Sequence, residues 1–138
     1  MRFFFYGTLR DPDVRRAVIG PGVDRISIVP ATLPGWRCVV MRGRHYPVLR
    51  PDSQAVTEGV IADGIDAAQA RRLDRFETDE YRARLVPVTA ASGRTVEALV
   101  YFAARPGLAA TTPWRLAEWR RRHKPRLVRG WSNPWRRA

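Results

Sequence analysis

The chain has 138 residues, of which 45% are hydrophobic, and a formal net charge of +12 at pH 7. This length and apolar content indicate one ordinary domain over residues 1–138 with a real core. The sequence has no run of eighteen apolar residues and no signal-peptide pattern, so we expect a cytoplasmic protein. The lone Cys38 excludes an internal disulfide or a multi-cysteine zinc cluster, and the two histidines lack metal-ligand spacing, so we expect no metal site.

The positive charge is concentrated near the C-terminus. Residues 114–138 contain nine arginines or lysines and one acid, so they hold +8 of the net charge. From about residue 113 we therefore expect a basic helix and tail rich in tryptophan and arginine. Two interpretations stay open: this segment binds nucleic acid or an anionic membrane, or its arginines are a solvated surface and Trp114 and Trp119 pack the helix on the domain. The interleaved residues are Trp114, Trp119, Trp131, Trp135, Arg120, Arg121, Arg122, Lys124, Arg126 and Arg129.

The first half of the chain predicts short strands around one helix. Arg2–Tyr6 is an aromatic, buried strand, and Asp11 with Pro12 begins a helix that ends near Ile19. Gly59 indicates a bulge or a close backbone approach. The other expected elements are strands over Ile26–Ala31, Trp36–Met41 and Val56–Ala62, a turn at Leu33–Gly35, and a short extended edge segment at Tyr46–Leu49.

The second half predicts a helix, a hairpin and a last helix. Asp66 caps a helix whose apolar face includes Leu73 and Phe76. Strands over Tyr81–Val88 and Val96–Phe102 flank a turn. The order of elements does not alternate strictly, which favours a mainly β, α+β fold over a doubly wound parallel sheet. The last helix is expected to start at Thr111–Pro113 and to end or kink at Pro125.

Two motifs carry the chemistry of the chain. The first strand ends in Tyr6-Gly7-Thr8-Leu9, and a strand-to-turn glycine can present bare backbone N–H groups to an anion. The second motif runs from Leu73 to Arg82 and places Glu77 at a helix end, where a carboxylate opposes the helix dipole. Taken alone, each motif is more often structural: a glycine turn, and a surface acid beside Asp74, Asp79 and Glu80.

The pair of motifs resembles the gamma-glutamylcyclotransferase-like family. Three further segments match it in order: Leu33-Pro34-Gly35-Trp36, Tyr46-Pro47-Val48 and Val56-Thr57-Glu58-Gly59-Val60. The resemblance covers roughly residues 3–102 and implies a small, mixed, partly closed β-barrel flanked by two or three helices. It further implies that Tyr6, Gly7, Thr8 and Leu9 bind a gamma-glutamyl group, that Glu77 is the acid and base, and that Tyr81 is a wall or hydrogen-bond donor.

The resemblance also implies a reaction that needs no metal or cofactor. The α-amine of a gamma-glutamyl small molecule attacks its own γ-amide carbonyl, which yields 5-oxoproline and a free amine. Burial against Phe76 and Tyr81 is expected to raise the pKa of Glu77 so that it can take and return the proton. Glutathione, gamma-glutamyl amino acids, gamma-glutamylamines and a gamma-glutamylated intermediate all fit the motifs. Thr78 departs from the family, which usually has glycine there, and a positive φ would be awkward for a β-branched residue.

Overall fold

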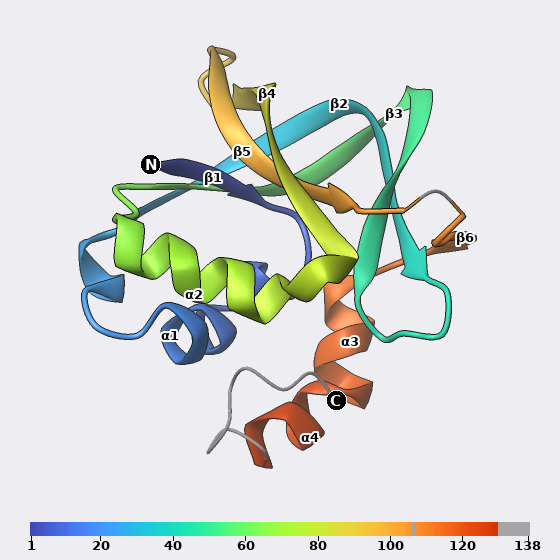
Figure 1. Ribbon diagram of the computed structural model, residues 1–138. Helices are drawn as coiled ribbons and strands as arrows, with labels where there is room; N and C mark the ends of the chain where they lie inside the picture. The colour runs from blue at the N-terminus through green and yellow to red at the C-terminus, as the bar shows by residue number, and fades with distance from the viewer. Residues whose placement is uncertain (106, 130–138) are drawn as a thin grey trace.

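The described strands form one mixed sheet that curls into a barrel (Figure 1). The computed structural model describes residues 1–105 and 107–129. The sheet order is β3-β1-β5-β4-β2, and a direct β2–β3 pairing joins its two ends, so these five strands close a barrel with β6 attached outside on β2. The bounds are β1 (Arg2–Phe5), β2 (Ser27–Met41), β3 (Pro47–Asp63), β4 (Tyr81–Ala90), β5 (Thr95–Ala103) and β6 (Ala109–Pro113). The expected α+β barrel is confirmed.

Strand β1 lies between β3 and β5 in the barrel. It pairs antiparallel with β3 and parallel with β5, where Phe3 stands opposite Leu99. Alternation along β1 sends Phe4 into one apolar cluster, with residues of β2, β3, β4 and β5, and sends Phe3 and Phe5 into a second cluster shared with the helices. Both faces of β1 are therefore buried, and its end is held firmly where the Tyr6–Leu9 motif begins.

The helices cover one side of the barrel (Figure 1). Helices α1 and α2 lie side by side, and Arg72 Nη1 of α2 donates to the Ile19 carbonyl at the end of α1 at 3.0 Å. No described helix is long and apolar enough to cross a membrane. The helical bounds are α1 (Pro12–Ile19), α2 (Ala67–Glu77), α3 (Leu116–Arg122) and α4 (Lys124–Arg129), with 3-10 turns η1 (Thr8–Arg10), η2 (Val23–Arg25) and η3 (Thr78–Glu80).

Two of the three predicted helix starts are confirmed. Asp11 accepts from the N–H groups of Asp13 and Val14, which caps α1. Asp66 and Gln69 form a capping box at the start of α2, each side chain bonding the other residue's backbone N–H.

The predicted turn at Leu33–Gly35 is wrong, because β2 runs through it as one strand of 15 residues. The register with β3 shifts between Pro34 and Trp36, so the positive φ of Gly35 is used in a bulge inside the strand. Likewise, the two predicted segments Tyr46–Leu49 and Val56–Ala62 belong to one strand, β3. Turn-favouring residues occur both in bulges and in chain reversals, so they do not predict which of the two forms. The long β2–β3 pairing determines that a bulge forms here.

The prediction that the last helix starts at Thr111–Pro113 is also wrong. These residues belong to β6, where Pro113 stands opposite Val39 of β2, and α3 begins only at Leu116. The break before Pro125 is confirmed, since α3 ends at Arg122 and Pro125 lies in the first turn of α4, where the missing proline N–H costs no helical bond.

The predicted packing of the last helix on the domain is confirmed. Trp114 and Trp119 are 9% and 5% exposed and belong to the apolar cluster between barrel and helices. These two rings are therefore not free to stack on a nucleic acid. Trp131 and Trp135 lie outside the described residues.

The close approach predicted at Gly59 is confirmed. A Cβ at Gly59 would sit 2.3 Å from the Phe5 carbonyl oxygen and 2.7 Å from the Phe4 ring, so β1 and β3 can meet here only if this position has no side chain. The end of β1, just before the Tyr6–Leu9 turn, is thereby fixed.

Candidate active site

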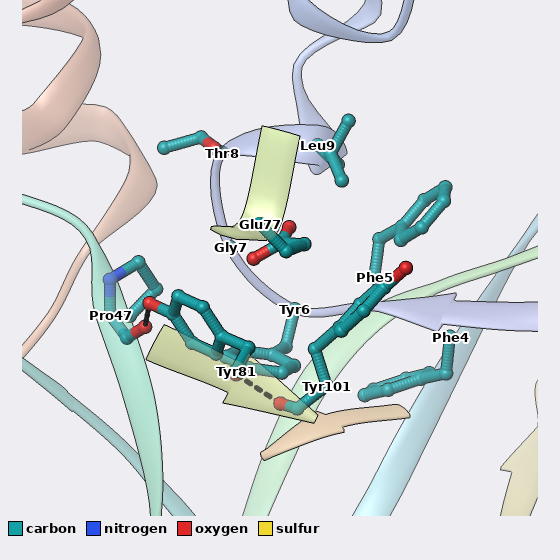
Figure 2. A pocket seen from close by; sticks show the side chains of 10 residues that line it. All are labelled: Phe4, Phe5, Tyr6, Gly7, Thr8, Leu9, Pro47, Glu77, Tyr81 and Tyr101. Carbon is teal, nitrogen blue, oxygen red and sulfur yellow. Dashed lines mark hydrogen bonds between the residues drawn. The ribbon is translucent and has the colours of Figure 1, made fainter. Parts of the chain in front are cut away.

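One cavity gathers all six residues that the sequence motifs single out. Its volume is about 310 Å³, including space open to solvent. The Tyr6–Leu9 turn lies on one side of it and Glu77 on another, although about seventy residues separate them in the chain (Figure 2). The lining residues are Phe4, Phe5, Tyr6, Gly7, Thr8, Leu9, Pro47, Glu77, Tyr81 and Tyr101.

Glu77 is the last residue of α2, and its carboxylate points into this cavity. The residue is only 7% exposed. In Figure 2 its side chain lies between the Gly7 turn and the rings of Tyr81 and Tyr101. A buried carboxylate that faces a cavity is a group that can exchange a proton with a bound ligand away from bulk water.

The Tyr6–Leu9 segment leaves β1 and enters the 3-10 turn η1 (Thr8–Arg10). The first bond of this turn is donated by Arg10 N to the Gly7 carbonyl at 3.0 Å. The N–H groups of Gly7, Thr8 and Leu9 precede that bond and so have no partner within the turn. Three successive N–H groups beside a cavity can bind an anionic group.

Gly7 is required here by close packing. Its φ is −112°, which other residues can adopt. A Cβ at this position would, however, lie 2.8 Å from Cγ of Pro47. The proline ring thus closes one side of the cavity directly against the turn.

Two tyrosines fix these walls by hydrogen bonds drawn in Figure 2. The Tyr81 hydroxyl donates to the Pro47 carbonyl at 2.5 Å, and the Tyr6 hydroxyl donates to the Tyr101 carbonyl at 2.5 Å. Tyr81 therefore both lines the cavity and holds Pro47 against Gly7.

Tyr101 and Pro47 are cavity residues to which the sequence analysis gave no role in the site. The Tyr101 hydroxyl donates to Asp74 Oδ1 at 2.5 Å. Burial first, then the hydrogen bond to Asp74 and the negative charges of Asp74 and Glu77, raise the pKa of Tyr101, so it stays neutral. In the sequence, the one indication of a role for Tyr101 was its polar hydroxyl within the apolar Val96–Phe102 segment.

The acids beside Glu77 are not all plain surface groups. Glu80 accepts from the Tyr46 hydroxyl at 2.5 Å and from Arg44 at 3.1 Å, which ties η3 to the loop before β3. Asp79 is exposed, as expected.

Thr78, directly after Glu77, is the one non-glycine residue with a positive φ in the described ranges 1–105 and 107–129. Its φ of 64° and ψ of −169° lie in a region that glycine almost alone populates. The strain anticipated at this position is therefore present, and it lies at the turn that aims Glu77.

Comparison with known proteins now identifies the family. The model of the family described as "Gamma-glutamyl cyclotransferase, AIG2-like" matches residues 3–121. The chain belongs to this family. It is similar to AIG2-like protein A of Arabidopsis thaliana, with 29% identity over 130 residues that cover 91% of this chain and 75% of that protein.

Solved structures show the same fold for this cyclotransferase-family chain. A solution structure of an Arabidopsis thaliana protein superposes with a TM-score of 0.65 at 28% identity, covering 94% of this chain and 86% of that one. A structure titled "Gamma-glutamyl cyclotransferase" superposes with a TM-score of 0.61 at 15% identity, covering 75% and 66%. The second likeness is one of fold alone.

Three other reactive side chains of this family member, Cys38, His45 and His123, do not line the cavity that holds Glu77. Burial raises the pKa of Cys38 to about 12 although the Arg10 charge opposes this shift, so its thiol is a poor nucleophile. The rings of His45 and His123 stack with centroids 3.7 Å apart. Within the described part of the chain no three His, Cys, Asp or Glu side chains cluster as metal ligands.

Proposed function

We propose that this chain is a gamma-glutamyl cyclotransferase that converts a gamma-glutamyl amide into 5-oxoproline and a free amine. The observation that carries the proposal is the placement of a nearly buried Glu77 across a small cavity from the Tyr6–Leu9 turn. Membership of the family supports the reaction class.

Binding comes first in the proposed reaction. The γ-glutamyl group enters the cavity, and its α-carboxylate is bound by N–H groups of the Gly7–Leu9 turn. The walls made by Pro47 and Tyr81 fold the chain of the substrate, so that the α-amine lies near its own γ-carbonyl carbon. Holding the two groups in this pose lowers the activation free energy by up to about 7–11 kcal/mol.

Proton transfer follows. Glu77 takes a proton from the α-ammonium group, and the freed amine nitrogen attacks the γ-carbonyl carbon to close a five-membered ring. The developing oxyanion is stabilised by backbone N–H donors of the same turn. The bond to the leaving nitrogen then breaks, and Glu77 returns the proton to that nitrogen. The ring nitrogen loses its second proton to Glu77, which passes it to the released amine, so that atoms and charges balance within one substrate molecule and one carboxylate.

The test is the Glu77→Gln variant. The amide has nearly the same shape but cannot accept the proton, so we expect 5-oxoproline release to fall at least about 100-fold. Circular dichroism and thermal unfolding should show an intact fold. Asp79→Asn is the matched control, because Asp79 is an exposed acid two residues away and outside the cavity, and it should retain activity. Full activity in Glu77→Gln would overturn the assigned role.

A further inference from the structure

A second, larger hollow adjoins the cavity. It spans about 1220 Å³, including open solvent, and Tyr6 lines both spaces. Its walls come from η1, β2, β3 and the start of α3. The lining residues that matter here are Arg10, Arg37, Glu58, Trp114, Arg115 and Arg120. We call this hollow the arginine groove.

We propose that the arginine groove binds an anionic group, carboxylate or phosphate, carried by the amine that the enzyme releases. This inference rests on the proposed cyclotransferase activity and narrows its substrates to gamma-glutamyl compounds with a negatively charged leaving amine.

The groove carries four arginines and one acid, Glu58. Arg37 pairs with Asp52 at 2.6 Å and Arg120 pairs with Asp11 at 2.8 Å, so these two are already partly neutralised. Among residues 1–105 and 107–129, neither Arg10 nor Arg115 forms a salt bridge. Their two charges exceed that of Glu58, so the groove attracts an anion.

The position of Arg10 links the groove to the reaction. Arg10 ends the η1 turn and directly follows the Thr8 and Leu9 groups assigned to the γ-glutamyl end. Arg10 lines this hollow together with Cys38. A substrate whose glutamyl end fills the cavity therefore has the remainder of its chain beside Arg10.

The residues that line the arginine groove favour a small anion over a long polymer as its ligand. Trp114 and Tyr6 are both buried and form apolar walls, and Tyr6 is shared with the smaller cavity, which has room only for a small group. Guanidinium groups bind carboxylates and phosphates through two parallel hydrogen bonds, which orient the anion and also neutralise its charge.

Two matched pairs of substrates test the inference by 5-oxoproline release. Gamma-glutamyl-glycine is compared with gamma-glutamyl-glycinamide, and gamma-glutamyl-O-phosphoethanolamine with gamma-glutamyl-ethanolamine. We expect kcat/KM to be about tenfold higher for the charged member of at least one pair, and the preference to shrink as salt is added. The pair with the larger ratio tells carboxylate from phosphate.

Variants of the groove test whether the preference for charged substrates depends on Arg10 and Arg115. Arg115→Gln should lower the charged-to-neutral ratio several-fold through KM, and the double variant Arg10→Gln with Arg115→Gln should bring it close to one. Arg94→Gln is the control, because Arg94 is an exposed arginine in the β4–β5 turn and does not line the groove.

Each other outcome is decisive. Equal turnover within both pairs, or a ratio unchanged in the double variant, overturns the groove inference and leaves the proposed function standing. No 5-oxoproline from any of the four compounds overturns the proposed function and this inference with it. Binding of single-stranded DNA or anionic vesicles through Arg10 and Arg115, without a substrate preference, would instead assign the groove to a polyanion.

Discussion

The hydroxyl of Tyr101 donates to Asp74 at 2.5 Å and so ties β5 to α2 three residues before Glu77. Residues three apart in a helix lie on the same side, so this bond holds the helical turn that ends in Glu77. Tyr101 also lines the cavity and presents its backbone carbonyl to the hydroxyl of Tyr6. It therefore connects the two halves of the candidate site without being an acid or base itself.

Removing this hydroxyl should disturb catalysis more than stability. For Tyr101→Phe we expect the free energy of unfolding to fall by about 1 kcal/mol, the usual contribution of such a bond. We expect kcat to fall about tenfold with KM little changed, because an ill-placed Glu77 weakens the transition state more than substrate binding. Steady-state kinetics and urea unfolding measure the two effects.

Tyr46→Phe is the matched control for that prediction. The Tyr46 hydroxyl donates to Glu80 at 2.5 Å, and Tyr46 does not line the cavity. A similar loss of stability with an unchanged kcat is expected. If both variants lost kcat equally, a positioning role for Tyr101 would be excluded.

Thr78→Gly should make the protein more stable. The observed φ of 64° and ψ of −169° cost a residue with a Cβ about 1–3 kcal/mol. Glycine removes that cost, although its greater unfolded-state freedom and the loss of the Thr78 Oγ1 bond to Glu80 N at 3.3 Å offset part of the gain. We expect a net rise of about 1 kcal/mol in the free energy of unfolding.

Thr78→Ala separates strain from the hydroxyl. Alanine keeps the Cβ and loses only the bond to Glu80, so urea unfolding should show no gain in stability. In Thr78→Gly, kcat should stay unchanged, since glycine can keep the same φ and ψ behind Glu77. A gain in the alanine variant equal to that in the glycine variant would show that backbone strain is not the cause.

Local sequence patterns correctly predicted the features that depend only on residues close together in the chain. The caps at Asp11 and Asp66 need only neighbouring N–H groups, and both are confirmed. The cavity around Glu77 and Gly7 followed from motif order, because a shared order of short motifs indicates a shared fold. Local patterns gave no sign that Tyr101 bonds Asp74, since that contact depends on how β5 and α2 pack.

The same reasoning explains the errors in the strands. By local chemistry Gly35 favours a turn and Pro113 a helix start, yet one lies in a bulge and the other in a strand paired with β2. Pairing over a long hairpin outweighs the preference of a single residue. The arginine groove was equally hidden, because its walls come from four separate elements.

Asp11 holds the start of α1 to the C-terminal helices, and its charge should contribute fully to stability except at strongly acidic pH. Its side chain is 1% exposed and accepts from Arg120 at 2.8 Å and Lys124 at 2.9 Å. Burial opposes ionisation, but the bonds from Lys124, Arg120 and the Val14 N–H outweigh it and lower the pKa of Asp11 below its ordinary 3.8. A lowered folded-state pKa means that this stabilisation is complete above about 3.8 and is lost as the pH falls further.

Asp11→Asn tests that link, because asparagine still caps the helix but carries no charge. We expect the free energy of unfolding at pH 7 to fall by about 2 kcal/mol, since two charged hydrogen bonds lose their anionic acceptor. The difference from the unmodified protein should narrow as the pH falls below about 3.8, where Asp11 takes up a proton first in the unfolded chain and then in the folded protein. Asp24→Asn is the control: its pair with Arg16 is exposed, so little change is expected at either pH. A difference between Asp11→Asn and the unmodified protein that stayed constant through the acid range would show that the carboxylate charge does not stabilise this contact.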